Sequence, residues 1–306
     1  ACGTGTLLMA AADSLVDNYV NASARHGQRP DIGAFQNKLL EEVIHGYDVL
    51  LSATHLTAST LALRAPNVTF EKMNLFTLPL GGADLRLGSI EFLKDKNLQI
   101  PKDFFRPASH QSKQVKGKRG GSSIPISLPD LDLCVMNPPF TRSVGGNLLF
   151  GSLSEEERAP MQKALQTLVR KKNVQASITA GLGSVFVGIA DPYIKENGRI
   201  GLVLPKTLLS GVAWERTREL LADKYRVEYI IASHDPKRWN FSENTDLSEV
   251  LVVAVKLYSS KPTPGNNKEE KDAGNITALN LWRNPDTSLE ALAIAKGLVE
   301  NKASDV

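Results

Sequence analysis

A short, mostly apolar strand runs directly into two prolines in the stretch Leu131-Asp132-Leu133-Cys134-Val135-Met136-Asn137-Pro138-Pro139-Phe140. The prolines remove two backbone N–H donors and hold the chain extended. The side-chain oxygen of Asn137 and the carbonyl of Pro138 can then point the same way, as adjacent acceptors for a planar exocyclic amine. Two acceptors would stabilise the cation that forms when the amine attacks an electrophile. Phe140 offers a face for base stacking, and the alternative is a rigid turn capped by a core phenylalanine.

Strands and helices alternate on both sides of this stretch. The pattern predicts helices over 7–20, 32–42 (with Asp31 as N-cap), 52–63, 155–172, 176–194 (ended by Gly198), 214–225 and from about 288. It predicts strands over 43–49, 68–75, 131–136, 199–204, 227–232, 250–258 and 276–282. This alternation predicts a parallel, three-layer α/β fold. Because no convincing helix separates the strands 227–232 and 250–258, we expect them to pair antiparallel at one edge.

The chain opens on Ala1-Cys2-Gly3-Thr4-Gly5-Thr6, and a helix follows at once. The glycines let the backbone approach a ligand closely, and the helix N-terminus presents free N–H groups. No lysine follows to complete a phosphate loop, so an uncharged or zwitterionic nucleoside fits better than a polyphosphate. A plain turn into a helix is the alternative.

Asp48 lies at the end of the predicted strand 43–49. Its carboxylate could accept hydrogen bonds from both hydroxyls of a ribose, and a solvent-exposed carboxylate at a strand end is the alternative. The glycine turn, Asp48 and the stretch 137–140 all lie where ligands bind in α/β sheets, at the carboxyl ends of strands. Their coincidence is the main structural indication of a site.

The composition is that of a globular protein: 306 residues, 42% hydrophobic and 23% charged. It excludes a disordered, fibrous or disulfide-stapled chain, and the two cysteines, Cys2 and Cys134, fit a reducing cytoplasm. No stretch reads as a membrane span or a secretion signal. The five histidines lack metal-ligand spacing, so we expect no metal. A net charge of +3 does not by itself indicate nucleic acid, although the basic loop 102–121 either contacts phosphates or is a solvated insertion.

Two of these segments resemble the motifs of DNA adenine-N6 methyltransferases. Ala1-Cys2-Gly3-Thr4-Gly5-Thr6-Leu7-Leu8 resembles their cofactor motif and Asn137-Pro138-Pro139-Phe140 their catalytic motif. The order of the two is similar to that of the gamma class and of modification subunits of restriction-modification systems. The similarity continues through 180–184, 198–205 and 241–246 and covers roughly residues 1–258. It implies S-adenosylmethionine as methyl donor and a Rossmann-like class I methyltransferase fold: a mostly parallel seven-stranded sheet with one antiparallel edge strand.

The resemblance also implies a role for each matching residue. Asn137, Pro138, Pro139 and Phe140 would hold the target adenine, and Phe241 is either a second aromatic against that base or a core residue. The position that meets the adenine of the cofactor is Ser89 or Asn74, and Ser89 is preferred because it precedes the insertion before the catalytic strand. The remaining cofactor contacts implied are Ala1, Cys2, Gly3, Thr4 and Gly5 around the methionine moiety and Asp48 and Val49 at the ribose.

The family pattern differs from this sequence at the beginning. The Asp-Pro of a first strand, the preceding cofactor segment and a target-recognition domain do not match any part of the chain. We therefore expect a truncated first strand, a catalytic domain over 1–258, a linker over 259–275 and a strand–helix extension over 276–306.

The predicted function is transfer of a methyl group to N6 of a flipped adenine in double-stranded DNA, in the cytoplasm, as the modification part of a restriction-modification system. Specificity or restriction subunits, or fused domains, would be its protein partners. Two alternatives stay open: an RNA or protein N-methyltransferase with the same Asn-Pro-Pro-aromatic motif, and a non-catalytic DNA-binding subunit that keeps the fold.

Overall fold

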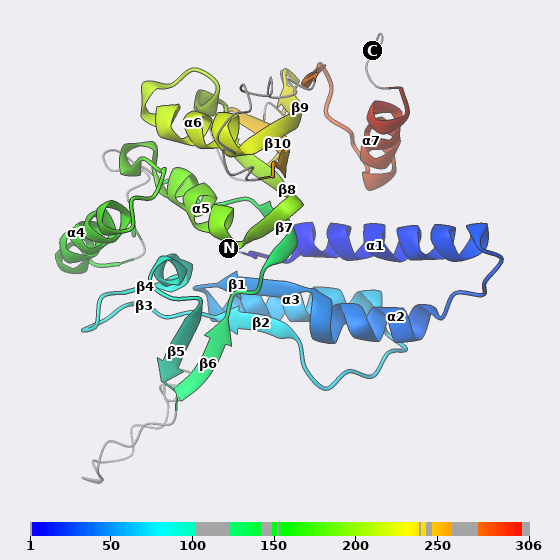
Figure 1. The fold of residues 1–306 in the computed structure, drawn as a ribbon, viewed down its shortest axis with the longest axis horizontal. Helices are drawn as coiled ribbons and strands as arrows, with labels where there is room; N and C mark the ends of the chain where they lie inside the picture. The colour runs from blue at the N-terminus through cyan, green and yellow to red at the C-terminus, as the bar shows by residue number, and fades with distance from the viewer. Residues whose placement is uncertain are drawn as a thin grey trace, which may run out of the picture. The chain divides into compact units, whose positions relative to one another are not determined.

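The computed structural model describes residues 2–101, 123–141, 149–151, 153–238, 240–242, 247–258 and 275–301. The chain divides into two compact units (Figure 1), the first formed by Ala1–Pro129 and Phe150–Lys172 and the second by Asp130–Leu149 and Asn173–Val306. Several predictions lie outside the described residues: Ala1, the basic loop 102–121, residues 243–246 of the run that begins at Phe241, and almost all of the linker.

The first unit contains a small parallel sheet, in which β1 (His45–Asp48) pairs with β2 (Asn74–Thr77). Helix α3 (Leu51–Arg64) lies between the two strands in the sequence, in the crossover that parallel strands require. Helix α1 (Thr6–Arg25) packs on α3 and on α2 (Ile32–Lys38), which a π-helical turn, Leu39–Val43, extends. The Asp31 carboxylate accepts a hydrogen bond from the N–H of Ala34 at 3.0 Å, which confirms it as the N-cap.

Two hairpins and a long helix complete the first unit. The strands β3 (Leu80–Gly81) and β4 (Arg86–Leu87) pair antiparallel, as do β5 (Asn97–Pro101) and β6 (Ser123–Ser127). Helix α4 (Glu155–Lys171) begins at Ser154, whose hydroxyl caps the N–H of Glu157. One core cluster of this unit lies beside α1, α2 and α3, and its buried members are Leu39, Leu40, Ile44, Leu61 and Ala65.

The second unit is built on a five-stranded sheet in the order β11-β9-β10-β8-β7. The strands are β7 (Leu131–Met136), β8 (Ile194–Pro205), β9 (Tyr225–Ser233), β10 (Glu249–Lys256) and β11 (Thr277–Leu281). Strand β7 runs parallel to β8 and β11 runs parallel to β9, whereas β10 is antiparallel to both of its neighbours. The helices are α5 (Leu182–Ala190), α6 (Glu215–Lys224) and α7 (Ser288–Asn301).

The observed sheets correct the predicted one. Within the described residues the strands form a five-stranded mixed sheet and three separate pairs, not one mostly parallel sheet of seven strands. The strands β9 and β10 do pair antiparallel, as predicted, but neither is an edge strand: β10 also pairs with β8, and β11 adds to the far side of β9. The coarser prediction of a mixed α/β architecture is confirmed.

Gly198 does not end a helix. Helix α5 ends at Ala190 and β8 begins at Ile194, so Gly198 lies within the strand. Leu131 pairs with Ile194 and Leu133 with Arg199, which leaves the residues between them in a bulge. Asn197 there has φ 62°, and a side chain on Gly198 would lie 2.8 Å from the carbonyl of Lys195. The strand prediction over 68–75 is also displaced, because β2 begins only at Asn74.

No helix in the described part of the chain is long and apolar enough to cross a bilayer. Nor do the described residues contain a group of three or more His, Cys, Asp or Glu side chains that could hold a metal ion.

Candidate functional site

The glycine turn of the first unit is tied to Asp48 at the end of β1. The N–H of Gly3 donates to Oδ2 of Asp48 at 3.0 Å, and the N–H of Leu50 donates to Oδ1 at 3.0 Å. Cys2 also donates its N–H to the carbonyl of Tyr47 at 3.0 Å, which continues the link between the turn and the strand. Asp48 is 7% exposed, so its carboxylate is a buried acceptor and not the solvated side chain of the alternative interpretation.

Thr57 of α3 holds the same turn from the other side. Its hydroxyl donates to the carbonyl of Gly3 at 2.9 Å and contacts Sγ of Cys2 at 3.7 Å, and the residue is completely buried. Gly5 has φ 83°, and a Cβ there would lie 3.0 Å from Cα and Cγ2 of Thr57. Gly5 is therefore required by its backbone conformation and by its contact with α3. Nothing in the sequence pattern had indicated Thr57.

The two candidates for the third cofactor position, Ser89 and Asn74, lie at different places in the first unit. A Cβ on Gly88 would lie 2.6 Å from Cγ1 of Val49, so Ser89 follows a residue in direct contact with the Asp48–Val49 pair. Asn74 lies at the opposite end of β2, paired with His45, and its side chain donates to the carbonyl of Glu41 at 2.8 Å. Three strand residues, about 10 Å, separate Asn74 from the end of β2 that lies beside Asp48. The structure therefore gathers Cys2, Gly3, Thr4, Gly5, Asp48, Val49 and Ser89 and leaves Asn74 apart.

The second unit carries the Asn-Pro-Pro-Phe stretch directly after β7, as predicted. The side chain of Asn137 is exposed and Pro138 is buried. The Nδ2 amide of Asn137 donates to the hydroxyl of Ser242 at 2.8 Å. Among the described residues, nothing donates a hydrogen bond to Oδ1 of Asn137 or to the carbonyl of Pro138. Neither acceptor is therefore already engaged by a described residue, and the side chain of Asn137 reaches solvent.

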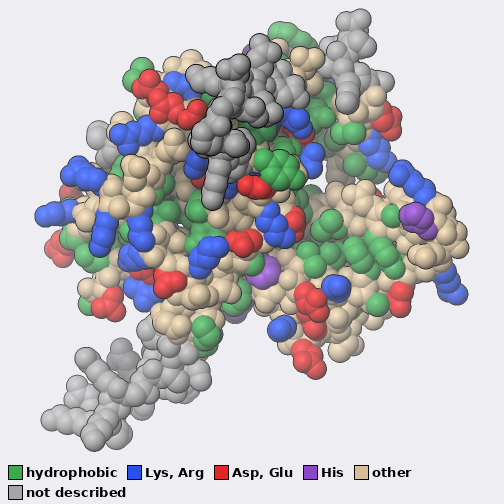
Figure 2. Space-filling view, in the orientation of Figure 1, with side chains coloured by type: hydrophobic (Ala, Val, Ile, Leu, Met, Phe, Trp, Pro, Cys, Tyr) green, Lys and Arg blue, Asp and Glu red, His purple; other side chains and the backbone are tan. Residues whose placement is uncertain are grey.

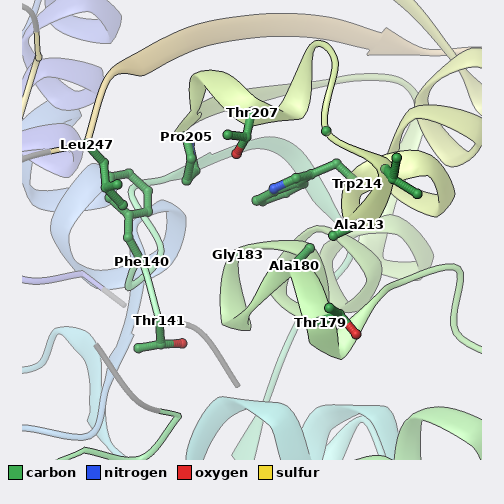
Figure 3. Close-up of a pocket in the computed structure, with 12 residues that line it drawn as sticks. Phe140, Thr141, Thr179, Ala180, Gly183, Pro205, Thr207, Ala213, Trp214 and Leu247 are labelled. Carbon is green, nitrogen blue, oxygen red and sulfur yellow. The ribbon is translucent and has the colours of Figure 1, made fainter. Parts of the chain in front are cut away.

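Phe140 and Thr141 line a cavity of about 330 Å³ within this unit (Figure 3). Phe140 lies at one side, and the ring of Trp214 points in from the other. Gly183 forms part of the wall, where a Cβ would lie 3.2 Å from the Trp214 ring. The residues that line the cavity come from the carboxyl ends of β7 and β8, the turn before α5 and its start, the segment between β8 and α6, and the segment before β10. They are Phe140, Thr141, Thr179, Ala180, Gly183, Pro205, Thr207, Gly211, Val212, Ala213, Trp214 and Leu247. The volume is at the small end of the range for ligand pockets.

Phe241 lies in the loop that brings Ser242 to Asn137. Its N–H and that of Ser242 donate to the same oxygen, Oε2 of Glu249, at 2.6 and 2.7 Å. Phe241 is half-buried and does not line the cavity, and its neighbour Ser242 makes the contact with Asn137. The stacking role predicted for Phe241 stays a prediction. Ser242 was missed, although the run from Phe241 had already indicated this segment.

The two thiols are unsuited to nucleophilic catalysis. Burial is the main cause that raises the pKa of Cys2, and burial raises the pKa of Cys134 to about 11. Cys134 packs against the core of the second unit, as expected for a strand residue. Neither thiol is therefore ionised to a useful extent at neutral pH.

A second, basic groove belongs to the first unit. It has a volume of about 510 Å³ and is lined by Leu85, Lys94, Pro160, Lys163, Ala164, Thr167, Leu168 and Lys171. Figure 2 shows Lys and Arg side chains gathered over α4, which supplies most of this lining. Lys94 is partly neutralised, because its Nζ lies 2.9 Å from Oε1 of Glu91.

No protein-family model matches the chain, and no curated protein matches its sequence. Solved structures do resemble it. A modification subunit of a putative type I restriction enzyme from Vibrio vulnificus YJ016 is 16% identical, with a TM-score of 0.30, over 57% of this chain and 32% of that one. A putative class I S-adenosylmethionine-dependent methyltransferase from Listeria monocytogenes is 12% identical, with a TM-score of 0.36, over 93% of this chain and 76% of that one.

A third structure, the ATP-dependent type ISP restriction-modification enzyme LlaBIII bound to DNA, is 12% identical, with a TM-score of 0.46. The match covers 85% of this chain and 16% of that one. The chain spans about a third of the length of the Vibrio subunit and a still smaller part of LlaBIII. These are the kinds of protein whose motifs the sequence resembles. The structural likeness is distant and does not establish an activity for this chain.

Proposed function

We propose that this chain is an S-adenosylmethionine-dependent methyltransferase domain that methylates the N6 amine of adenine in DNA, as part of a restriction-modification system. The observation that carries the proposal is the pair of available acceptors, Oδ1 of Asn137 and the carbonyl of Pro138, at the end of β7 and beside the cavity that Phe140 lines. An exocyclic amine has two N–H donors, which matches two acceptors.

The first unit has the features that a nucleoside-type methyl donor needs. The carboxylate of Asp48 accepts two backbone N–H bonds, and its two oxygens can accept more, so it retains capacity for the hydroxyls of a ribose. A Cβ on Gly3 would meet nothing within 4 Å, which leaves open space against the turn for the methionine moiety. Ser89, which follows the Gly88 that contacts Val49, would contact the adenine of the donor. S-adenosylmethionine, when bound, supplies an electrophilic methyl group on a sulfonium sulfur.

The residues of the second unit would act on the acceptor nucleotide. Asn137 and Pro138 would each accept one N–H of the adenine amine, which turns its lone pair out of conjugation and stabilises the positive charge that develops on nitrogen. Once the nitrogen has gained the methyl group, one of these protons leaves to water. Phe140 would stack on the base, at about 1–3 kcal/mol. An adenine inside a duplex must be flipped out to reach these groups.

Incubation of the full chain with tritiated S-adenosylmethionine and a panel of acceptors tests the proposal. The acceptors are unmethylated genomic DNA, total RNA and total protein. Label in DNA alone is expected. Label in RNA or protein alone would favour the corresponding alternative, and calorimetric binding of S-adenosylmethionine without transfer to any acceptor would favour a non-catalytic subunit.

A further inference from the structure

Ser242 is the residue that the Nδ2 arm of the Asn137 amide contacts. Its hydroxyl accepts the Nδ2–H of Asn137 at 2.8 Å, although 105 residues separate the two in the sequence. An asparagine amide carries its acceptor and its donors on opposite arms, and a rotation of 180° exchanges them. With Nδ2 engaged by Ser242, Oδ1 is the arm left for a ligand. The opposite orientation would present N–H donors to an amine that is itself a donor.

A buried carboxylate anchors the C-terminal part of the loop that carries Ser242. Glu249, at the start of β10, is completely buried, and its Oε2 accepts the N–H groups of Phe241 and Ser242 at 2.6 and 2.7 Å. Its Oε1 has no hydrogen-bond partner in the described part of the chain. The two hydrogen bonds to Oε2 fix the backbone position of Ser242.

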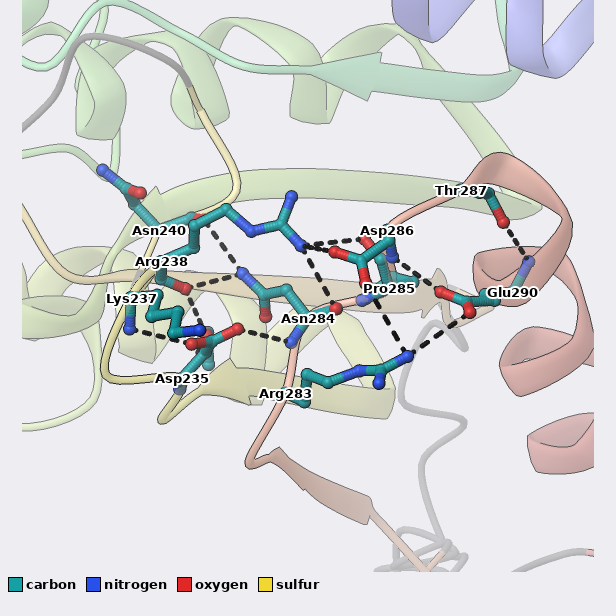
Figure 4. Close-up of polar contacts among 11 residues, drawn as sticks. Asp235, Lys237, Arg238, Asn240, Arg283, Asn284, Pro285, Asp286, Thr287 and Glu290 are labelled. Atoms are coloured by element: carbon teal, nitrogen blue, oxygen red, sulfur yellow. Dashed lines mark hydrogen bonds and ion pairs between the residues drawn. The ribbon is translucent and has the colours of Figure 1, made fainter.

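A second network anchors the N-terminal part of the same loop (Figure 4). Asn284, buried just after β11, donates its Nδ2–H groups to the carbonyls of Arg238 and Asn240 at 2.7 and 3.2 Å. Asp235 accepts the N–H of Asn284 at 3.0 Å and the N–H of Lys237 at 2.8 Å. Asn240 immediately precedes Phe241, so both anchors act on the backbone within two residues of Ser242.

We propose that Ser242 is a positioning residue for Asn137, and that the anchors at Glu249 and Asn284 hold it in place for this purpose. The inference rests on the proposed function, because it assigns to Ser242 the task of presenting Oδ1 of Asn137 to the substrate amine. Ser242 does not itself contact the substrate. Its role is to hold the amide in place before the substrate arrives, with Nδ2 on the hydroxyl and Oδ1 left for the substrate amine, which removes a reorganisation step from the transition state.

The kinetic test compares Ser242→Ala, Ser242→Thr and the control Ser288→Ala, which removes an exposed hydroxyl at the start of α7. We expect Ser242→Ala to lower kcat by about 3- to 10-fold, the equivalent of one neutral hydrogen bond, with KM for S-adenosylmethionine and for unmethylated DNA unchanged. Ser242→Thr, which keeps the hydroxyl, and Ser288→Ala should retain the wild-type kcat. An unchanged kcat in Ser242→Ala, or a loss that Ser242→Thr does not restore, would overturn the inference.

A spectroscopic test does not depend on activity. In a chain labelled with ¹⁵N at asparagine side chains, the Asn137 amide is identified as the signal that Asn137→Ala loses. We expect one of its two protons to be shifted downfield in the wild-type chain, and the shift to disappear in Ser242→Ala. Two Asn137 protons with ordinary shifts in the wild-type chain would overturn the inference, whether or not the variant folds.

The two proposals fail in different ways. A wild-type chain that transfers no methyl group to any acceptor overturns the proposed function and, with it, the catalytic purpose assigned to Ser242. If the wild-type chain is active and Ser242→Ala leaves kcat unchanged, only the positioning role is overturned.

Discussion

The glycine turn and the Asn-Pro-Pro-Phe stretch hold their ligand-facing groups in different ways. In the turn, the backbone groups of Gly3 are bound by two buried side chains, Asp48 and Thr57. At the end of β7, the hydrogen bond that the described residues give the Asn137 side chain joins it to Ser242, and both side chains are partly or fully exposed. Glu249 supports the backbone of Ser242 in turn. The turn is therefore held by buried side chains, whereas the Asn137 amide is held at the surface.

Substitutions in the two regions should therefore lower different properties of the chain. Damage to the turn should lower stability and cofactor affinity together, because the same buried bonds provide both. Damage around Asn137 should lower the rate of transfer and leave cofactor affinity and global stability nearly unchanged.

Replacing Asn137 should have the largest effect. Asn137→Ala removes an acceptor that strengthens as charge develops on the amine, and loss of one such preorganised group costs about 10²–10³ in kcat. Initial rates with tritiated S-adenosylmethionine and calorimetry with the same donor give the two quantities. A variant that loses cofactor affinity and keeps its kcat would reverse the roles assigned to the two regions.

Asp48→Ala should have the next largest effect. It removes the acceptor of the Gly3 and Leu50 N–H groups as well as that of the ribose, so we expect cofactor affinity to fall by about 10- to 100-fold and stability by about 2 kcal/mol. Calorimetry and urea unfolding measure these. Asp48→Asn keeps one acceptor oxygen and should lose less of both, whereas unchanged affinity in Asp48→Ala would exclude Asp48 from the cofactor site.

Gly5→Ala should lower stability more than the same substitution at Gly27, a glycine outside the turn. Gly5 and Gly27 have φ 83° and 64°, so alanine strains the backbone at either by about 1–2 kcal/mol. Only Gly5 has the additional contact with Thr57, because a Cβ on Gly27 meets nothing within 4 Å. Urea unfolding should therefore show a larger loss for Gly5→Ala than for Gly27→Ala. Equal losses would show that packing of the turn on α3 contributes little.

The smallest effect concerns pH and the loop behind Ser242. Hydrogen bonds from the N–H groups of Asn284 and then Lys237 lower the pKa of Asp235. Since the pKa in the folded chain lies below the unfolded value of about 3.9, the stabilisation is present above that value and is lost as the pH falls through the folded pKa. Urea unfolding of wild type and Asp235→Asn should thus differ more at pH 6 than at pH 3. A gap that widens toward pH 3 would contradict this sign.

Local signals predicted much of the fold. The Asp31 cap, the strand ending at Asp48 and the strand entering Asn137 each depend on residues a few positions apart, and all three are confirmed. The sheet order was not predictable in the same way. The place of β10 depends on its pairing with both β8 and β9, and the bulge at Gly198 depends on the register between β7 and β8. These are pairings between distant segments.

In the candidate site, too, local motifs were predictable and contacts between distant residues were not. Glycines before a helix and prolines after a strand can be recognised within four consecutive residues, so the sequence indicated them. Thr57 and Ser242 are ordinary hydroxyl residues whose importance comes from contacts 54 and 105 residues away. A single sequence contains no signal for such contacts.

The central claim is that Asn137 presents its oxygen to the N6 amine of adenine. Incubation with S-adenosylmethionine carrying a trideuterated methyl group, followed by mass spectrometry of the nucleosides from unmethylated DNA, tests it most directly. The account predicts deuterated N6-methyldeoxyadenosine with the wild-type chain and a loss of about 100-fold or more with Asn137→Ala. Deuterium in another nucleoside, or equal N6-methyldeoxyadenosine from the two chains, would contradict it.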